Sequence, residues 1–123
     1  MSHHIGIDII EIARIEEAIA HWGERFLQRV FSESEIRAYR QQPSSLAARF
    51  AGKEAVIKAL GATISGIKLS DIEILSHPSG QPLVRLHGRA QSQAEHLGLD
   101  RLAISLSHSK DYAIAMVTGD TEH

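Results

Sequence analysis

The sequence predicts an α+β domain, in which helices and β-hairpins follow one another along one chain. Three features carry this prediction: a long helix over residues 44–61, an isoleucine-rich strand near the start, and two hairpins in the second half. A chain of 123 residues fits one domain and is long enough for a hydrophobic core. Residues 1–123 show no internal repeat or linker, so we expect them to form a single domain.

Residues 4–12 are predicted to form a buried strand, because β-branched isoleucine dominates them. Alternation places two sets of residues on opposite faces, Ile5, Ile7 and Ile9 on one and Gly6, Asp8 and Ile10 on the other. Asp8 is unusual there, because a carboxylate in an apolar strand must be paired, hydrogen-bonded or bound to a metal. We expect Gly6 to leave open space beside Asp8. A carboxylate that caps a nearby backbone is the structural alternative.

Short helices are predicted between this strand and the long helix. Residues 13–21 have the apolar spacing of an amphipathic helix, which Gly23 ends. Residues 24–30 are expected to form a helical turn. Ser32 and Glu35 match the capping-box pattern, which predicts a short helix that ends near residue 40.

The long helix has clear boundary signals, since Pro43 precedes it and Gly61 ends it. Its apolar stripe consists of Leu46, Phe50, Ile57 and Leu60, and a second face carries Ala47, Ala51, Glu54, Ala55 and Lys58. The alanines of this second face are expected to leave room for an approaching group. Gly52 costs about 1 kcal/mol relative to alanine, which predicts that a backbone or a ligand comes close. The alternative for Glu54 and Lys58 is an ordinary surface pair, worth about 0.2–0.5 kcal/mol.

The second half of the chain is predicted to contain two hairpins and a helix. A turn at residues 77–81 joins strands 71–76 and 82–87, and residues 102–109 and 112–118 form the second hairpin. A helix over residues 88–97 lies between them, residues 62–70 form a loop, and the tail from residue 119 is expected to be frayed. His108, at the end of a strand, is either a core histidine or a group that contacts a ligand.

Composition and charge exclude several classes of protein. A net charge of −2 argues against a general nucleic-acid binder. Residues 25–53 contain six basic residues and only two acidic ones. This local excess of positive charge indicates either a surface that binds an anionic partner or an ordinary solvated surface of mixed charge. The absence of cysteine excludes disulfides, the histidines lack metal-ligand spacing, and no GxSxG motif presents a serine nucleophile. Neither a signal peptide nor a membrane span is predicted, so we expect a cytoplasmic protein.

Three segments resemble the bacterial holo-acyl-carrier-protein synthases: GIDIIEIARI at residues 6–15, RFAGKEAVIKALG at 49–61 and SLSHSKDYAIAMV at 105–117. DIEI at residues 71–74 and SGQP at 79–82 also match in order and spacing. One departure is visible, because Gly-Ala-Thr at residues 61–63 replaces the Gly-Thr-Gly that is usual in the family. The resemblance implies an antiparallel sheet packed against a long central helix, and a homotrimer with sites at the subunit interfaces.

The resemblance also implies an activity. Such enzymes transfer 4′-phosphopantetheine from coenzyme A to a serine of apo acyl carrier protein, require Mg²⁺, release adenosine 3′,5′-bisphosphate and support fatty acid biosynthesis. Asp8 and Glu54 match the metal ligands of the family, and Lys58 matches a group that neutralises phosphate. These three are the expected catalytic residues. His108 matches a position near the nucleotide phosphates, and Arg49 and Lys58 are also expected to bind coenzyme A.

The residue types suit this chemistry, since phosphoryl transfer depends on positioning and charge neutralisation, and Mg²⁺ prefers oxygen ligands. Either Glu54 or a metal-bound water could accept the proton of the serine. Carrier proteins are acidic, so Arg14 in the matching motif and Arg25, by its charge, are predicted to bind that partner. The alternatives are a non-enzymatic binder of carrier protein or coenzyme A, a metal-dependent phosphohydrolase, and a structural interaction module.

Overall fold

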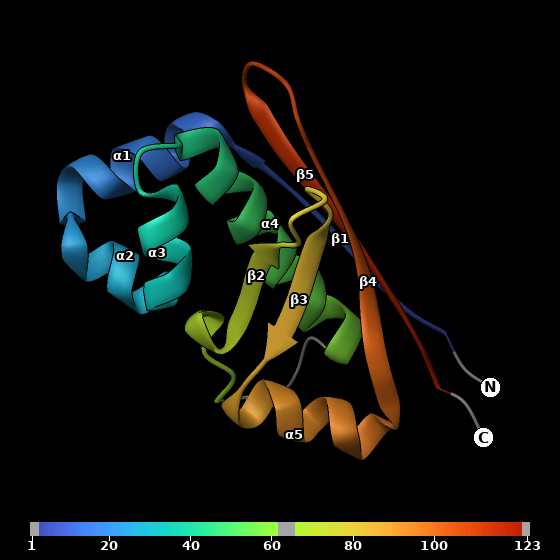
Figure 1. Cartoon of the computed structure of the whole chain (residues 1–123). Helices are drawn as coiled ribbons and strands as arrows, with labels where there is room; N and C mark the ends of the chain where they lie inside the picture. Colours follow the sequence, from blue (N-terminus) through green and yellow to red (C-terminus); the bar gives the residue numbers. More distant parts are fainter. Residues whose placement is uncertain (1–2, 62–65, 122–123) are drawn as a thin grey trace.

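The computed structural model describes residues 3–61 and 66–121 (Figure 1). The elements in chain order are β1 (His3–Glu11), α1 (Ile12–Trp22), α2 (Glu24–Val30), α3 (Glu33–Tyr39), α4 (Pro43–Leu60), a 3₁₀ turn η1 (Leu69–Asp71), β2 (Ile72–Ser76), β3 (Pro82–Leu86), α5 (Gly88–Leu97), β4 (Leu99–His108) and β5 (Tyr112–Thr121). One antiparallel sheet has the order β1-β5-β4, and β2 and β3 form a separate hairpin. The predicted α+β class is therefore confirmed.

Helix α4 lies at the centre of the fold, against β1 and β5 on one side and β2 on another (Figure 1). Most of its residues are buried, including the alanines of the face that we expected to be open. A helix that is surrounded by other elements does not need a single apolar stripe. The prediction that this alanine face is open is therefore wrong, because β1 and β5 cover it.

Gly6 lets β1 lie directly against the backbone of α4. A Cβ atom at Gly6 would stand 1.8 Å from the carbonyl oxygen of Ala55, so the open space predicted beside Asp8 is filled by the helix. Gly52 has a similar role on the other side of α4, where a Cβ atom would stand 2.6 Å from Cδ1 of Ile74. Its close neighbours are side chains, and not the backbone or ligand that we expected. Both glycines position α4 by allowing close packing.

The sheet is covered by α4 on one face only. On the other face three isoleucines of β1 are exposed, Ile5 by 65%, Ile7 by 53% and Ile9 by 59%. The prediction of a fully buried strand is therefore wrong for this face. Exposed side chains of β5 continue it, because Ile9 pairs with Ile114 and Ile7 with Met116. We call this surface the open sheet face; it consists of Ile5, Ile7, Ile9, Tyr112, Ile114 and Met116.

Most element boundaries agree with the sequence predictions to within a few residues. The capping box of α3 is formed, since Ser32 and Glu35 exchange backbone–side-chain hydrogen bonds. The prediction of a frayed tail from residue 119 is wrong, because β5 continues to Thr121. Gly119 pairs with both His4 and Leu102. Part of the predicted loop, residues 62–65, lies outside the described residues. In the described part of the chain, no helix is long and apolar enough to cross a membrane.

Candidate active site

Asp8 on β1 and Lys58 on α4 meet where the strand crosses the helix. The Lys58 ammonium donates to Oδ1 of Asp8 at 3.2 Å and to the carbonyl oxygen of Ile7 at 2.9 Å. The alternative of an ordinary surface pair between Glu54 and Lys58 is therefore wrong, because Lys58 forms its ion pair with Asp8, 50 residues away in the sequence. This contact keeps the Lys58 ammonium next to Asp8, whose carboxylate is predicted to bind a metal.

Asp8 and Glu54 both line one pocket of about 340 Å³, which is called the carboxylate pocket below. Its lining residues are Asp8, Ile10, Arg14, Ile15, Ala18, Phe26, Phe50 and Glu54. The structure thus brings together two predicted metal ligands and one predicted partner-binding residue. Sequence reasoning did not identify Phe26 and Phe50 as walls of a site. The spacing of Phe50, one helical turn before Glu54, was an available signal for it.

The environment of this pocket raises the pKa of Glu54. Partial burial is the main cause, the nearby negative charge of Asp8 adds to it, and the Lys58 ammonium opposes it. Among the described residues, the carboxylate of Glu54 has no hydrogen bond or ion pair. Two carboxylates that repel each other in a partly buried pocket are typical of a functional site, and a bound cation would relieve the repulsion.

The donor set of Asp8 and Glu54 fits Mg²⁺, which takes oxygen ligands and is usually held by one or two carboxylates, with phosphate and water as the other ligands. Within residues 3–61 and 66–121, no group of three or more histidine, aspartate or glutamate side chains could hold a metal ion by itself. A Mg²⁺ ion here would therefore take its further ligands from water and from a phosphate-bearing substrate.

Glu54→Gln is expected to raise the melting temperature at neutral pH. A carboxyl whose pKa is raised in the folded state supplies stability when protonated, and this stability is lost as the pH rises through the folded-state pKa. The charged form of Glu54 therefore lowers stability at neutral pH, and an uncharged amide removes that cost. Thermal unfolding of both proteins between acid and neutral pH measures the difference, which should vanish once Glu54 is protonated in both states. The matched substitution Glu95→Gln, on the exposed side of α5, should show no such pattern.

His108 lies apart from these residues within one chain. It is exposed at the end of β4, whereas Asp8 is on β1, and β5 separates the two strands. Asp8 of β1 pairs with Ala115 of β5, which in turn pairs with Leu106 of β4. His108 is therefore separated from Asp8 by two strand spacings, about 9–10 Å, and by two further residues along β4. His108 does not line the pocket that contains Asp8 and Glu54.

Arg49 is a buried structural residue in this fold. Its guanidinium donates to the carbonyl oxygen of Ile74 at 3.1 Å, to that of Ser45 at 3.3 Å, and to the hydroxyls of Tyr39 and Ser76 at 2.9 and 3.0 Å. It also lies over the ring of Tyr39, 3.7 Å from the centroid. These contacts hold α4 against α3 and β2, and they give no support to the predicted role of Arg49 in binding coenzyme A.

The two arginines predicted to bind a partner are both exposed, Arg14 on α1 and Arg25 on α2. Arg14 lines the carboxylate pocket and also a shallow hollow beside Trp22 at the end of α1. Trp22 is 55% exposed, although tryptophan is large and apolar. Sequence reasoning did not select Trp22, and its exposure adds an apolar contact to a surface that carries both Arg14 and Glu17.

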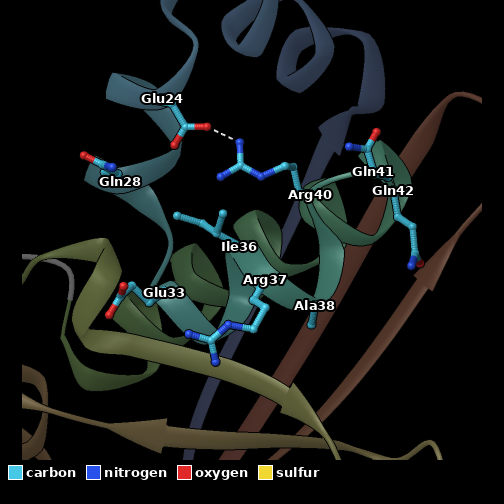
Figure 2. Close-up of a pocket in the computed structure, with 9 residues that line it drawn as sticks. All are labelled: Glu24, Gln28, Glu33, Ile36, Arg37, Ala38, Arg40, Gln41 and Gln42. Atoms are coloured by element: carbon cyan, nitrogen blue, oxygen red, sulfur yellow. Dashed lines mark hydrogen bonds and ion pairs between the residues drawn. The ribbon is translucent and has the colours of Figure 1, made fainter.

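A larger hollow of about 670 Å³ lies between α2 and α3 (Figure 2). Its walls carry both signs of charge, and Glu24 and Arg40 form an ion pair across it. None of the predicted site residues lines it. We therefore place the candidate active site at Asp8 and Glu54, where the electrostatics, the pocket and the sequence motifs coincide.

The sequence model of the 4′-phosphopantetheinyl transferase superfamily matches residues 4–117. The chain is 51% identical over 114 residues to the holo-[acyl-carrier-protein] synthase of Dehalococcoides mccartyi strain 195, across 93% of this chain and 95% of the relative. It is 47% identical over 121 residues to the enzyme of that name from Herpetosiphon aurantiacus, across 93% and 95% of the two chains. The chain therefore belongs to the 4′-phosphopantetheinyl transferase superfamily.

Solved structures agree with this assignment. The fold is similar to that of Helicobacter pylori holo-[acyl-carrier-protein] synthase in complex with coenzyme A, with a TM-score of 0.84 and 38% identity over 94% of this chain and 99% of that one. The Neisseria meningitidis synthase gives a TM-score of 0.86 at 29% identity, over 96% and 98% of the two chains. Within the superfamily, the chain belongs to the holo-[acyl-carrier-protein] synthases, which confirms the resemblance seen in the sequence.

Proposed function

We propose that the chain transfers the 4′-phosphopantetheine group from coenzyme A to a serine of apo acyl carrier protein. The reaction depends on Mg²⁺, releases adenosine 3′,5′-bisphosphate and supports fatty acid biosynthesis. The observation that carries the proposal is the pairing of Asp8 and Glu54 at one pocket, with the Lys58 ammonium 3.2 Å from Asp8. A relative of this family has been crystallised with coenzyme A, which supports the donor. A cytoplasmic location stays a prediction.

In this proposal the protein neutralises charge and positions the reacting groups, as phosphoryl transfer requires. Asp8 and Glu54 would hold Mg²⁺, which would supply positive charge to neutralise the pyrophosphate of coenzyme A. Lys58 adds a point charge that can turn from Asp8 toward a phosphate oxygen, since its side chain is half exposed. Glu54, with its raised pKa, is one candidate to accept the proton of the acceptor serine.

The same site favours a homotrimer in which active sites form between chains. His108 is separated from Asp8 within one chain, so a ligand that contacts both is most easily held if the two come from different subunits. The open sheet face supports such an assembly, because contiguous exposed apolar surface marks protein–protein contacts. We infer that this face is covered by other copies of the chain.

Acyl carrier protein is proposed to dock on α1 and α2, next to the mouth of the carboxylate pocket. Arg14 and Arg25 supply positive charge there, and Trp22 and Phe26 supply apolar contacts. An acceptor serine that enters from this side reaches Glu54 past Phe26 and Phe50. The partner is acidic, so charge complementarity would speed its encounter with this surface.

Arg14→Glu is expected to raise the apparent KM for carrier protein by roughly tenfold, and to leave the KM for coenzyme A nearly unchanged. The effect should shrink at high salt, because exposed charges are screened. Steady-state kinetics with each substrate varied in turn, at two ionic strengths, measure both effects. Arg85→Glu places the same charge reversal on the exposed side of β3 and should alter neither KM. Equal changes in both KM values for Arg14→Glu would contradict this docking surface.

Release of adenosine 3′,5′-bisphosphate tests the reaction against its alternatives. The proposal predicts release only when coenzyme A, Mg²⁺ and apo carrier protein are all present. A metal-dependent phosphohydrolase would release it without carrier protein, whereas a non-enzymatic binder or a structural module would release none under any condition.

A further inference from the structure

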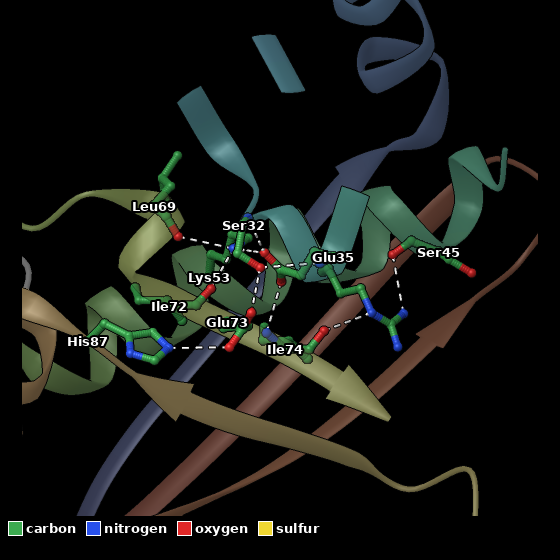
Figure 3. Close-up of polar contacts among 10 residues, drawn as sticks. Ser32, Glu35, Ser45, Lys53, Leu69, Ile72, Glu73, Ile74 and His87 are labelled. Atoms are coloured by element: carbon green, nitrogen blue, oxygen red, sulfur yellow. Dashed lines mark hydrogen bonds and ion pairs between the residues drawn. The ribbon is translucent and has the colours of Figure 1, made fainter. Parts of the chain in front are cut away.

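Lys53 is a completely buried lysine next to Glu54 in the sequence. Its ammonium donates to Oε1 of Glu35 at 2.7 Å, to the carbonyl oxygen of Leu69 at 3.0 Å, and to the carbonyl oxygen of Ile72 (Figure 3). These three acceptors match the three donors of an ammonium group. They come from α3, η1 and β2, so one side chain joins α4 to three other elements.

Glu35 is also completely buried, and its contacts complete the network. Its two carboxylate oxygens accept from the backbone N–H groups of Ser32 and Ile74 as well as from Lys53. The group formed by Lys53 and Glu35 is called the Lys53 lock below. None of its atoms lines the carboxylate pocket, so the reaction does not use it directly.

Stability alone is a poor explanation for a buried ion pair of this kind. Removing two charges from water is costly, and well-packed apolar residues of similar volume often serve equally well or better. What directional hydrogen bonds add is a fixed relative position of the elements that they join. The Lys53 lock is therefore best explained by what its geometry holds in place.

The apolar packing of α4 against the sheet supplies only part of that positional information, and the hydrogen bonds of Lys58 to Ile7 and Asp8 of β1 supply another part. The helix meets β1 and β5 through small residues, chiefly Ala51, Ala55 and Gly6. Small side chains allow close approach, but they lack the projecting groups that fix rotation and register. Lys53 and Glu54 are successive residues, about 100° apart around the helix axis, so a contact that fixes Lys53 also fixes the direction of Glu54.

We propose that Lys53 is a positioning residue, which sets the rotation of α4 so that Glu54 faces Asp8 across the carboxylate pocket. This inference rests on the proposed function, because it assigns the spacing of the two carboxylates to the metal-dependent transfer. Partners that orient metal ligands without touching the metal typically affect metal affinity or activity by about 10–100-fold. The Lys53 lock acts in that way from a helix face about 100° away from Glu54.

The test compares two variants in which the lock is removed without leaving a charge unpaired, Lys53→Met with Glu35→Gln, and Lys53→Gln with Glu35→Gln. Val56→Ala is the control, because Val56 is fully buried on the same helix and its truncation leaves a cavity without removing a hydrogen bond of the lock. Melting temperature, kcat, KM for coenzyme A, and Mn²⁺ affinity by electron paramagnetic resonance are measured for each protein.

The lock variants are expected to fold, to lose about 10–100-fold in kcat and in Mn²⁺ affinity, and to keep KM for coenzyme A within a few-fold of wild type. Val56→Ala should lower the melting temperature and leave kcat and Mn²⁺ affinity near wild type. Wild-type kcat and Mn²⁺ affinity in a folded lock variant would overturn the inference, as would unfolding of both lock variants while Val56→Ala folds. Absence of transfer by the wild-type protein would instead contradict the proposed function.

Discussion

Asp8→Asn and Glu54→Gln are each expected to lower phosphopantetheine transfer by several orders of magnitude, while the protein stays folded. Each substitution keeps the shape of the side chain and removes one of the two charges that face the pocket. The loss is large because a metal held by two carboxylates depends on both. Initial rates of transfer at saturating Mg²⁺ measure the effect, and circular dichroism verifies the fold.

The double variant distinguishes a shared metal from two separate roles. If both carboxylates hold one ion, the loss in the double variant should be close to that of either single variant, because residues that act as a unit are strongly non-additive. Glu95→Gln on α5 is the matched control and should be fully active. A double-variant loss equal to the product of the single losses, or activity in excess chelator, would contradict a shared metal.

Ile114→Glu is expected to convert a trimer into monomers and to remove most of the transfer activity. Ile114 lies within the open sheet face and pairs with Ile9 of β1, so a charge there would be buried without a partner in any assembly that covers this face. Light scattering at micromolar concentration measures the mass, and the same samples are assayed for transfer.

Gln91→Glu adds the same charge on the exposed part of α5 and should remain trimeric and active. A wild-type protein that is monomeric and fully active would contradict the shared active site. Retained activity in monomeric Ile114→Glu would do so as well.

Local signals were sufficient to predict most elements of this fold. These signals act within a few positions of the sequence: the capping box at Ser32, the residues at the two ends of α4, and the turns of both hairpins. The motifs around Asp8, Glu54 and Lys58 identified residues that the structure brings together, because each motif keeps its spacing on one strand or one helix.

Features that depend on distant segments could not be predicted in this way. Arg49 was expected to bind coenzyme A, but both Arg49 and Lys53 are buried, because their acceptors lie on other elements, at Ile74 and Ile72 among others. Alternation along β1 separated its two faces correctly, yet only the position of α4 decides which face is covered. The separation of His108 from Asp8 likewise follows from strand order, which no local pattern encodes.

The central claim is transfer of a phosphopantetheine arm, and the mass of the carrier protein tests it most directly. Purified apo acyl carrier protein is incubated with coenzyme A, Mg²⁺ and this protein, and its intact mass is measured. The account predicts a gain of one phosphopantetheine group on a single serine, with no gain when Mg²⁺ is chelated or when Asp8→Asn replaces the wild-type protein. An unchanged carrier mass with the wild-type protein and all components present would contradict it.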